Sequence, residues 1–266
     1  MKRRVLLGLI IVLALVFVGC QKDEDDTIIN VGATPVPHSE LLELVKDDLE
    51  EQGYTLEIVE FTDYITPNTS LADGAIDANF FQHKPYLDEF INEQNLDLTS
   101  IGTIHVEPLG LYSDKYEDIT SLSDDAVIAI PSDSVNGGRA LILLENNGLI
   151  TLKEDAGLKA TADDIIDNPK GFVFKSIEAA QLARVLPDVD AAVINGNYAL
   201  EADLSPVGDA LILEGAESPY ANIIVTRTED KDKEKLLALL EALQSDEVRS
   251  FIEATYGGAV VEAFDH

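Results

Sequence analysis

Two long extended runs, each broken near its middle, restrict the fold of this chain more than any other feature. Residues 101–113 read IGTIHVEPLGLYS, and residues 211–227 read LILEGAESPYANIIVTR. Proline cannot donate a hydrogen bond inside a sheet, so Pro108 and Pro219 interrupt their strands. A chain that leaves one α/β unit for another and later returns needs two such crossings. The sequence therefore predicts two lobes, with a single doubly wound sheet that contains two kinked strands as the alternative.

Strand-like and helix-like segments alternate along the rest of the chain. Residues 27–34 and 54–61 are rich in β-branched residues, and residues 39–52 between them carry leucine and valine at helical spacing. A β-α-β opening of this kind predicts a parallel sheet with helices on its faces. Further strands are expected at 75–81, 126–132, 171–177 and near 190–195, and further helices at about 85–94, up to 148, at 233–244 and at 246–256.

The two broken runs divide the chain into its predicted domains. Residues 28–109 together with 222–266 are expected to form lobe 1, and residues 110–221 to form lobe 2. A chain of 266 residues is long enough for two such units, each with its own core. Interfaces between domains are a preferred place for ligands, so we expect a ligand cleft between the lobes.

The N-terminus is organised as a secretory signal. Three basic residues at 2–4 precede an apolar run at 5–18, which is short for a membrane span of roughly 20 residues. The segment FVGC, which ends at Cys20, resembles a bacterial lipobox, although Phe17 stands where leucine is usual. We therefore predict a signal peptide at 1–19, then a lipidated Cys20 and a flexible acidic tether up to residue 27. A single transmembrane anchor is the alternative reading.

The charge of the chain excludes one class of partner. Eighteen Lys and Arg residues against 50 Asp and Glu residues give a formal net charge of −32. Such a chain repels phosphates, so nucleic acid is not expected as its main partner.

The sequence contains no recognisable catalytic motif. It lacks a Gly-x-Ser-x-Gly elbow, a Walker A loop and a His-Glu-x-x-His pair, and its one cysteine lies in the lipidation signal. We predict that the protein is not an enzyme and that it carries no cofactor and no metal. His38, His83 and His105 keep a zinc or manganese site open as an alternative, because imidazole and carboxylate suit these ions.

Polar residues at three places are suited to a small zwitterion. Asn136 and Arg139 lie in DSVNGGRAL, at the expected start of a helix where backbone N–H groups favour an anion, and Arg139 can grip a carboxylate with two hydrogen bonds. Asn195, Asn197 and Asn222 each follow or end an apolar run and carry both donors and acceptors. An ordinary helix cap, a surface ion pair and turn contacts are the alternative roles.

The stretch NFFQHKPYLDEF, residues 79–90, concentrates aromatic residues in a chain without tryptophan. Phe80, Phe81 and Tyr86 offer ring faces and edges, against which a thioether packs well. An aromatic wall opposite an Arg and Asn cluster would fit an apolar amino acid. The alternative is that the rings fill the core below a strand end.

Seven segments make the chain similar to the NlpA/MetQ family of methionine-binding lipoproteins over residues 29–264. They are VGATPVPHSELLE, FTDYITPN, GAIDANFFQHKPYLDEF, EPLGLYS, IAIPSDSVNGGRAL, AAVINGNYA and ESPYANIIVTR. The resemblance implies an α/β fold of the periplasmic-binding-protein kind, type II-like, with two lobes, two crossover segments and a ligand cleft between them.

The resemblance also implies roles for particular residues. Arg139 would bind the ligand carboxylate, and Asn195 and Asn222 would hold its polar groups. The side-chain pocket and its rim would be formed by Tyr64, Phe80, Phe81, His83, Tyr86 and Asn136. Two departures from the family pattern, Phe80 and the sequence NGG at 136–138, bear on the shape of this pocket.

The function implied by the resemblance is capture of a ligand for an ABC importer. The expected ligand is methionine, with the L-isomer first, and the expected partners are a membrane permease and its ATPase. D-Methionine, a methionine-containing dipeptide and a divalent metal are the alternative ligands. An enzyme on the same scaffold, or a surface protein without a ligand, are the other classes considered. The protein would be held by its lipid at the extracytoplasmic face of the cell membrane.

Overall fold

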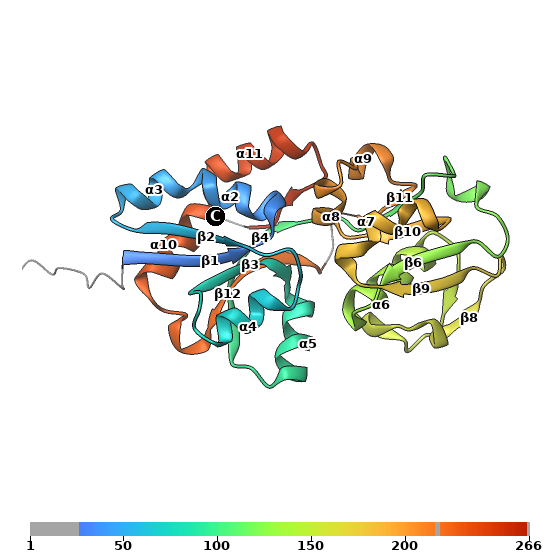
Figure 1. Cartoon of the computed structure of the whole chain (residues 1–266), viewed down its shortest axis with the longest axis horizontal. Coiled ribbons are helices and arrows are strands. Elements are labelled where there is room, and N and C mark those ends of the chain that lie inside the picture. Colours follow the sequence, from blue (N-terminus) through green and yellow to red (C-terminus); the bar gives the residue numbers. More distant parts are fainter. Residues whose placement is uncertain (1–26, 216–218, 265–266) are drawn as a thin grey trace, which may run out of the picture.

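The computed structural model describes residues 27–215 and 219–264. The predicted signal peptide at 1–19, the lipidation site Cys20 and the tether up to residue 26 lie outside the described residues. The described chain forms two lobes that lie side by side (Figure 1).

Lobe 1 is built on a six-stranded sheet with the order β13-β4-β12-β3-β1-β2. Strands β1, β2 and β3 are parallel, whereas β12 runs antiparallel to both β3 and β4. The strands are β1 (Ile28–Ala33), β2 (Thr55–Glu60), β3 (Ala78–His83), β4 (Leu98–Val106), β12 (Ala221–Arg227) and β13 (Val261–Glu262). Because strand residues alternate between the two faces, β4 and β12 each contribute to two different cores.

Helices cover both faces of this sheet (Figure 1). On one face, Leu41, Leu49 and Leu239 pack with Ile29 and Ile224. On the other face, a smaller core contains residues such as Leu71, Leu87 and Ile223. The helices are α2 (Glu40–Leu44), α3 (Lys46–Glu51), α4 (Thr66–Ala72), α5 (Lys84–Gln94), α10 (Glu234–Leu243) and α11 (Asp246–Tyr256).

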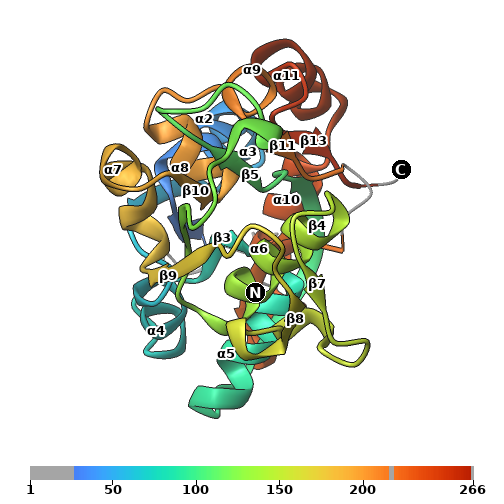
Figure 2. The same ribbon diagram turned by 90° about the vertical axis from the view of Figure 1, so that its right-hand side faces the viewer.

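Lobe 2 is built on a five-stranded sheet with the order β11-β5-β10-β6-β9, and it faces the viewer in Figure 2. Helix α6 (Ser134–Asn146) packs on one face and α7 (Leu182–Val185) on the other. Two further short helices are α8 (Gly196–Glu201) and α9 (Pro206–Asp209). The strands are β5 (Gly110–Tyr112), β6 (Val127–Pro131), β9 (Val173–Ile177), β10 (Ala191–Ile194) and β11 (Ile212–Leu213).

The two broken runs of the sequence cross between the sheets. Run 101–113 supplies the end of β4 to lobe 1 and β5 to lobe 2, and run 211–227 supplies β11 to lobe 2 and β12 to lobe 1. The predicted two-lobe fold is confirmed, and the alternative of a single doubly wound sheet is wrong. Residues 107–109, between β4 and β5, connect the lobes, and the second connection lies between β11 and β12.

Some elements differ from the sequence-based expectation. The helix expected at 39–52 is split, because Val45 ends α2 with non-helical backbone angles before α3 begins. A two-stranded sheet of β7 (Thr151–Leu152) and β8 (Ile165–Asp167) was not predicted, and neither was β13. Strands of two or three residues are too short to show an alternating pattern.

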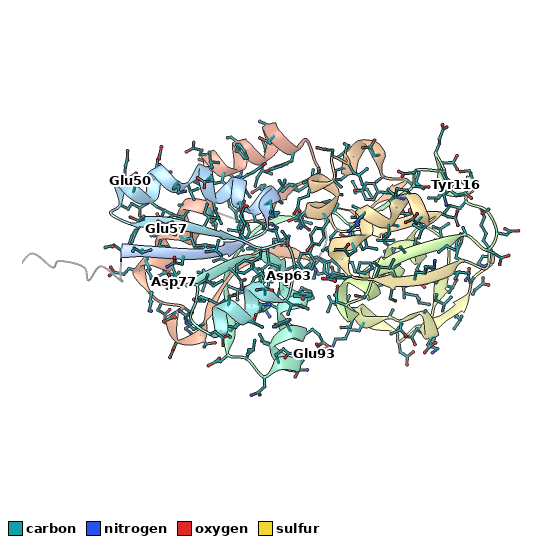
Figure 3. The ribbon with its side chains drawn as sticks, viewed as in Figure 1. Glu50, Glu57, Asp63, Asp77, Glu93 and Tyr116 are labelled. Atoms are coloured by element: carbon teal, nitrogen blue, oxygen red, sulfur yellow. The ribbon has the colours of Figure 1, made fainter. Side chains whose placement is uncertain are left out.

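The acidic surplus lies on the surface of both lobes. Glu50, Glu57 and Glu93 of lobe 1, which are labelled in Figure 3, are all exposed. Among the described residues, no helix has the length and apolar content that a membrane crossing requires.

Candidate functional site

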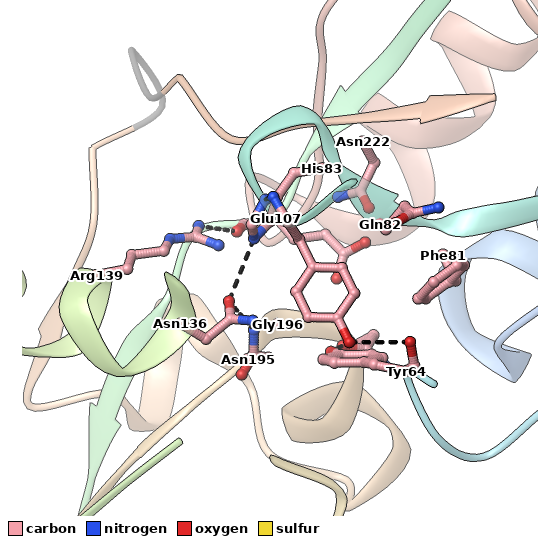
Figure 4. A pocket seen from close by; sticks show the side chains of 12 residues that line it. Tyr64, Phe81, Gln82, His83, Glu107, Asn136, Arg139, Asn195, Gly196 and Asn222 are labelled. Carbon is pink, nitrogen blue, oxygen red and sulfur yellow. Dashed lines mark hydrogen bonds between the residues drawn. The ribbon is translucent and has the colours of Figure 1, made fainter. Parts of the chain in front are cut away.

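A cavity lies where the two lobes meet, and we call it the interlobe cavity. It encloses about 340 Å³, including the space open to solvent at its mouth. Figure 4 shows its side chains converging from both lobes. The lining residues are Tyr64, Phe81, Gln82, His83, Tyr86, Glu107, Asn136, Arg139, Asn195, Gly196, Asn197 and Asn222.

One wall of the interlobe cavity is aromatic. The ring centroids of Tyr64 and Phe81 lie 5.8 Å apart, and those of Phe81 and Tyr86 lie 6.2 Å apart. The Tyr86 hydroxyl donates to the backbone carbonyl of Tyr64 at 3.0 Å, and the Tyr64 hydroxyl donates to Asn197 Oδ1 at 2.5 Å. These bonds use the polar ends of both tyrosines, so the ring surfaces are left to form an apolar wall.

Phe80 does not belong to this wall, which corrects the expectation from sequence. Its side chain is fully buried in the main core of lobe 1, and its ring meets those of His38 and His105 at centroid distances of 4.6 and 5.3 Å. Phe80 and Phe81 are neighbours on β3, so their side chains point to opposite faces of the sheet. Only Phe81 lines the interlobe cavity.

His83 connects the aromatic wall to the polar side. It is the N-cap of α5, where its Nδ1 accepts a hydrogen bond from the Tyr86 backbone N–H at 3.2 Å. Its Nε2 then carries the proton and donates to Asn136 Oδ1 at 3.2 Å. Burial, and then the nearby charge of Arg139, lower the pKa of His83 from 6.5 to about 3. The ring is therefore neutral at physiological pH.

Replacing His83 should change how stability depends on pH. In the unfolded chain His83 takes up a proton below pH 6.5, but in the folded chain only near pH 3. The neutral His83 therefore contributes to the free energy of unfolding above pH 6.5, and this contribution is lost as the pH falls. In His83→Asn, which keeps a cap acceptor, the slope of the unfolding free energy between about pH 6 and 4.5 should fall by up to about 1.4 kcal/mol per pH unit. Denaturant titrations of ligand-free protein test this, and an unchanged slope would contradict a neutral His83.

Arg139 forms the cationic end of the interlobe cavity and is 3% exposed. Its Nε donates to Glu214 Oε1 at 3.0 Å, and its Nη2 donates to Glu214 and to the Glu107 carbonyl oxygen, the latter at 2.9 Å. The guanidinium carbon lies 4.2 Å from the ring centroid of Tyr220. Nη1 makes no hydrogen bond to any described residue. Glu214 thus occupies the Nε–Nη2 edge of the guanidinium, through which Arg139 could otherwise bind a carboxylate with two hydrogen bonds.

The start of α6 fixes the position of Arg139. The Asp133 carboxylate caps the helix by accepting from the Asn136 backbone N–H at 2.8 Å. A Cβ on Gly137 would lie 2.8 Å from the Pro131 carbonyl oxygen, so the second residue of NGG must be glycine here. The close approach of α6 to β6 depends on this residue.

Amide side chains line the cavity from both lobes. Asn195 Nδ2 donates to Asn136 Oδ1 at 3.0 Å, whereas Asn195 Oδ1 is buried without a hydrogen-bond partner among the described residues. Asn222 Oδ1 faces His38 Nε2 at 3.3 Å. Of the residues expected at the site, all but Phe80 line the cavity.

Glu107 and Gln82 line the cavity but were not predicted to do so. Gln82 is held in a buried amide network with Asn68 and Asn79, at 2.7 and 2.9 Å from Nε2 to their Oδ1 atoms. Glu107 Oε1 lies 2.8 Å from His105 Nε2 and 3.2 Å from His38 Nε2. One sequence signal for Glu107 is its place as an acid directly before Pro108 in an apolar run.

The histidines considered for a metal do not all meet. His38 and His105 come together with Glu107, and one ligand atom from each lies within 4.8 Å of the others. His83 instead contacts Asn136 and Tyr220. The three clustered residues are chemically suited to a divalent ion, but the set differs from the one that the sequence suggested.

Comparison with known proteins identifies the family. The family profile described as NlpA lipoprotein matches residues 29–264. The chain belongs to the NlpA lipoprotein family. Among curated NlpA-like relatives, the membrane lipoprotein TpN32 of Treponema pallidum is 42% identical over 256 residues, which cover 96% of this chain and 95% of that protein. The D-methionine-binding lipoprotein MetQ of Salmonella typhimurium is 40% identical and covers 94% of each chain.

Solved structures of similar proteins share the NlpA fold. A nutrient-binding protein of Burkholderia cenocepacia, solved with bound methionine, is 44% identical with a TM-score of 0.86, and the match covers 89% of this chain and all of the other. The methionine-binding protein MetQ is 38% identical with a TM-score of 0.87, covering 91% of this chain and all of the other. These similarities extend over both lobes.

Proposed function

We propose that this NlpA-family lipoprotein captures methionine, with the L-isomer first, for an ABC importer. One observation carries the proposal: the interlobe cavity places the Arg139 cation opposite a wall of Tyr64, Phe81 and Tyr86. An amino acid with an unbranched thioether side chain complements both ends, because sulfur packs well against ring edges and a guanidinium pairs with a carboxylate. The relatives that are named for methionine support the same choice.

In this proposal each polar group of the cavity has a task. Arg139 Nη1, with Asn136 and Asn222, would receive the ligand carboxylate. Asn195 Oδ1, which has no partner among the described residues, would accept from the ligand. His83 would separate the polar end from the rings.

We further propose that the cavity opens and closes by a hinge. The predicted lobes, 28–109 with 222–266 and 110–221, would rotate about the two segments that connect them. Contacts between the lobes are present in this structure: the Tyr198 hydroxyl donates to the Thr62 carbonyl at 3.2 Å, and Lys159 pairs with Glu89. Closure would remove the ligand from water, so its charges must be paired within the cavity.

The protein would act by capture and delivery rather than by catalysis. Lipidation at Cys20 would hold it at the extracytoplasmic face of the cell membrane. This tether would raise its effective concentration near a membrane permease and the ATPase of that permease.

Thermal unfolding tests the ligand class. The full chain, unfolded and refolded to remove ligand, is heated with each of a panel of amino acids and with zinc and manganese. A ligand at about 1,000 times its dissociation constant stabilises the folded state by about 4 kcal/mol. L-Methionine should therefore raise the unfolding temperature by roughly 10 °C, and leucine should have little effect.

The panel also separates the alternatives. If D-methionine or a methionine-containing dipeptide raised the unfolding temperature more than L-methionine does, the proposed ligand would change but the proposed site would not. A rise in the unfolding temperature with zinc or manganese alone would favour a metal site at His38, His105 and Glu107. This metal site is the second candidate function, because the three residues lie close together. No rise with any amino acid would contradict the proposal.

A further inference from the structure

One member of the aromatic wall lies outside the helices and strands of lobe 1. Tyr64 lies in the loop between β2 and α4, whereas Phe81 lies on β3 and Tyr86 on α5. Phe81 and Tyr86 are buried together with Phe90 in a small apolar cluster, and Tyr64 packs against the edge of that cluster. The place of the Tyr64 ring in the wall therefore depends on what else its side chain contacts.

The side chain of Tyr64 is anchored in lobe 2. Its ring stacks on the ring of Tyr198 of α8, with the centroids 4.9 Å apart and an interplanar angle of 29°. Its hydroxyl donates to Asn197 Oδ1 at 2.5 Å. The ring also packs against the apolar core of lobe 2 to which Tyr198 belongs. Because stacked aromatic pairs stabilise more than their buried area alone, Tyr198 is well suited to fix the Tyr64 ring.

Tyr198 is itself held firmly between the lobes and is 6% exposed. Its hydroxyl donates to the backbone carbonyl of Thr62, two residues before Tyr64, at 3.2 Å. At the start of α8, a Cβ on Gly196 would lie 2.8 Å from Glu107 Cβ, so only glycine permits this close approach of α8 to the connecting segment. Tyr198 lies outside the cavity lining that the described residues form, so it can reach a ligand through Tyr64 rather than directly.

The stack between Tyr64 and Tyr198 joins residues of different lobes. Rotation of the lobes about their connecting segments would separate the two rings and break the hydrogen bond to Asn197. Phe81 and Tyr86 would keep their places, because both are packed within lobe 1. The aromatic wall thus has a part that is fixed in lobe 1 and a part that depends on lobe 2.

We infer that Tyr198 is a positioning residue for ligand selection, which holds the Tyr64 ring in the aromatic wall so that the wall is complete only when the lobes meet. The inference rests on the proposed function, because it concerns the same cavity. It adds that the choice between ligand side chains depends on a residue of lobe 2 that lies behind the wall.

Two ligands isolate this effect. L-2-Aminobutyrate keeps the ammonium group, the carboxylate and the first two side-chain carbons of L-methionine, but it lacks the sulfur and the terminal methyl group. We call the ratio of the two affinities the side-chain preference. A variant that weakens only closure or folding lowers both affinities and leaves the side-chain preference unchanged, whereas a displaced Tyr64 ring lowers the affinity for L-methionine more.

Titration calorimetry of the full chain and of folded variants tests the inference. Tyr198→Leu removes the stacked ring and should reduce the side-chain preference by roughly three- to tenfold. Tyr198→Phe keeps the ring and should leave the side-chain preference within about twofold. The matched control is Tyr112→Leu, which removes another buried tyrosine from the same core of lobe 2, outside the cavity lining, and should also leave it within about twofold.

A double substitution shows whether Tyr198 acts through Tyr64. Tyr64→Leu alone should reduce the side-chain preference, because it removes the ring from the wall. Adding Tyr198→Leu to Tyr64→Leu should then cause no further reduction, since the two residues act as one unit. Additive losses would show that Tyr198 acts by another route and would overturn its positioning role.

The unaltered full chain provides a test that does not depend on the folding of any variant. If the wall is completed only when the lobes meet, L-methionine and L-2-aminobutyrate should associate at rates within about threefold and differ mainly in their dissociation rates. Rapid mixing with detection by tyrosine fluorescence measures both rates. A side-chain preference carried mainly by association would overturn the inference.

The outcomes separate this inference from the proposed function. If the full chain binds L-methionine with a side-chain preference that folded Tyr198→Leu retains in full, the inference fails and the proposed function stands. If the full chain binds no amino acid, both proposals fail.

Discussion

Arg139→Ala should weaken methionine binding by about 2–5 kcal/mol, from roughly thirtyfold to several thousandfold. The substitution removes the cation from the polar end of the interlobe cavity and leaves a ligand carboxylate buried without a partner. Glu214, whose side chain is 17% exposed, also loses its ion pair. Titration calorimetry of the ligand-free variant measures the change in affinity.

Two further variants distinguish a loss of ligand binding from a loss of the fold. Arg249→Ala removes an arginine from α11, outside the cavity, and should leave the affinity unchanged. Arg139→Lys keeps a charge but cannot contact Glu214, the Glu107 carbonyl and a ligand together, so its affinity should be intermediate. Near-native affinity in a folded Arg139→Ala protein would remove Arg139 from the site.

Phe80→Ala should lower the free energy of unfolding by about 3–5 kcal/mol, because it leaves a cavity in the main core of lobe 1. For a domain of this size, that corresponds to a fall of roughly 6–20 °C in the unfolding temperature of the ligand-free protein. Phe80 is fully buried against His38 and His105, so little relaxation is available. Chemical denaturation and thermal unfolding measure the loss.

The neighbouring phenylalanine provides the contrast. Phe81→Ala should reduce the affinity for methionine through the loss of ring contacts in the cavity. Phe251→Ala, at a half-buried position beside the same core, controls for removal of a ring and should cost less stability than Phe80→Ala. A small effect of Phe80→Ala on stability would contradict the packing described here.

The lobes and the aromatic wall could be predicted from sequence because their signals are local. Pro108 and Pro219 interrupt extended runs, and the rings of Phe81 and Tyr86 cluster within a few residues. Phe80 was wrongly expected in the wall because the strand pattern shows that neighbours face opposite ways but not which neighbour faces the ligand. Phe80 belongs to the buried core that includes residues of α2, α3 and α10, and this tertiary packing decides which neighbour faces the ligand.

Glu107 and Glu214 could not be found in the same way. The chain has 50 acidic residues, and nothing local marks Glu214 as partly buried, whereas the local signal for Glu107 is its place before Pro108 in an apolar run. Their contacts with distant residues are tertiary: His38 reaches Glu107 from a separate segment, and Arg139 reaches Glu214 from 75 residues away. Sequence patterns report burial along one element but not the meeting of distant side chains.

The central claim is that one methionine binds between the lobes, and isothermal titration calorimetry of the refolded, ligand-free full chain with L-methionine tests it most directly. The account predicts saturable binding of one L-methionine per chain. Absence of binding heat at several temperatures, together with no thermal stabilisation by L-methionine, would contradict the account.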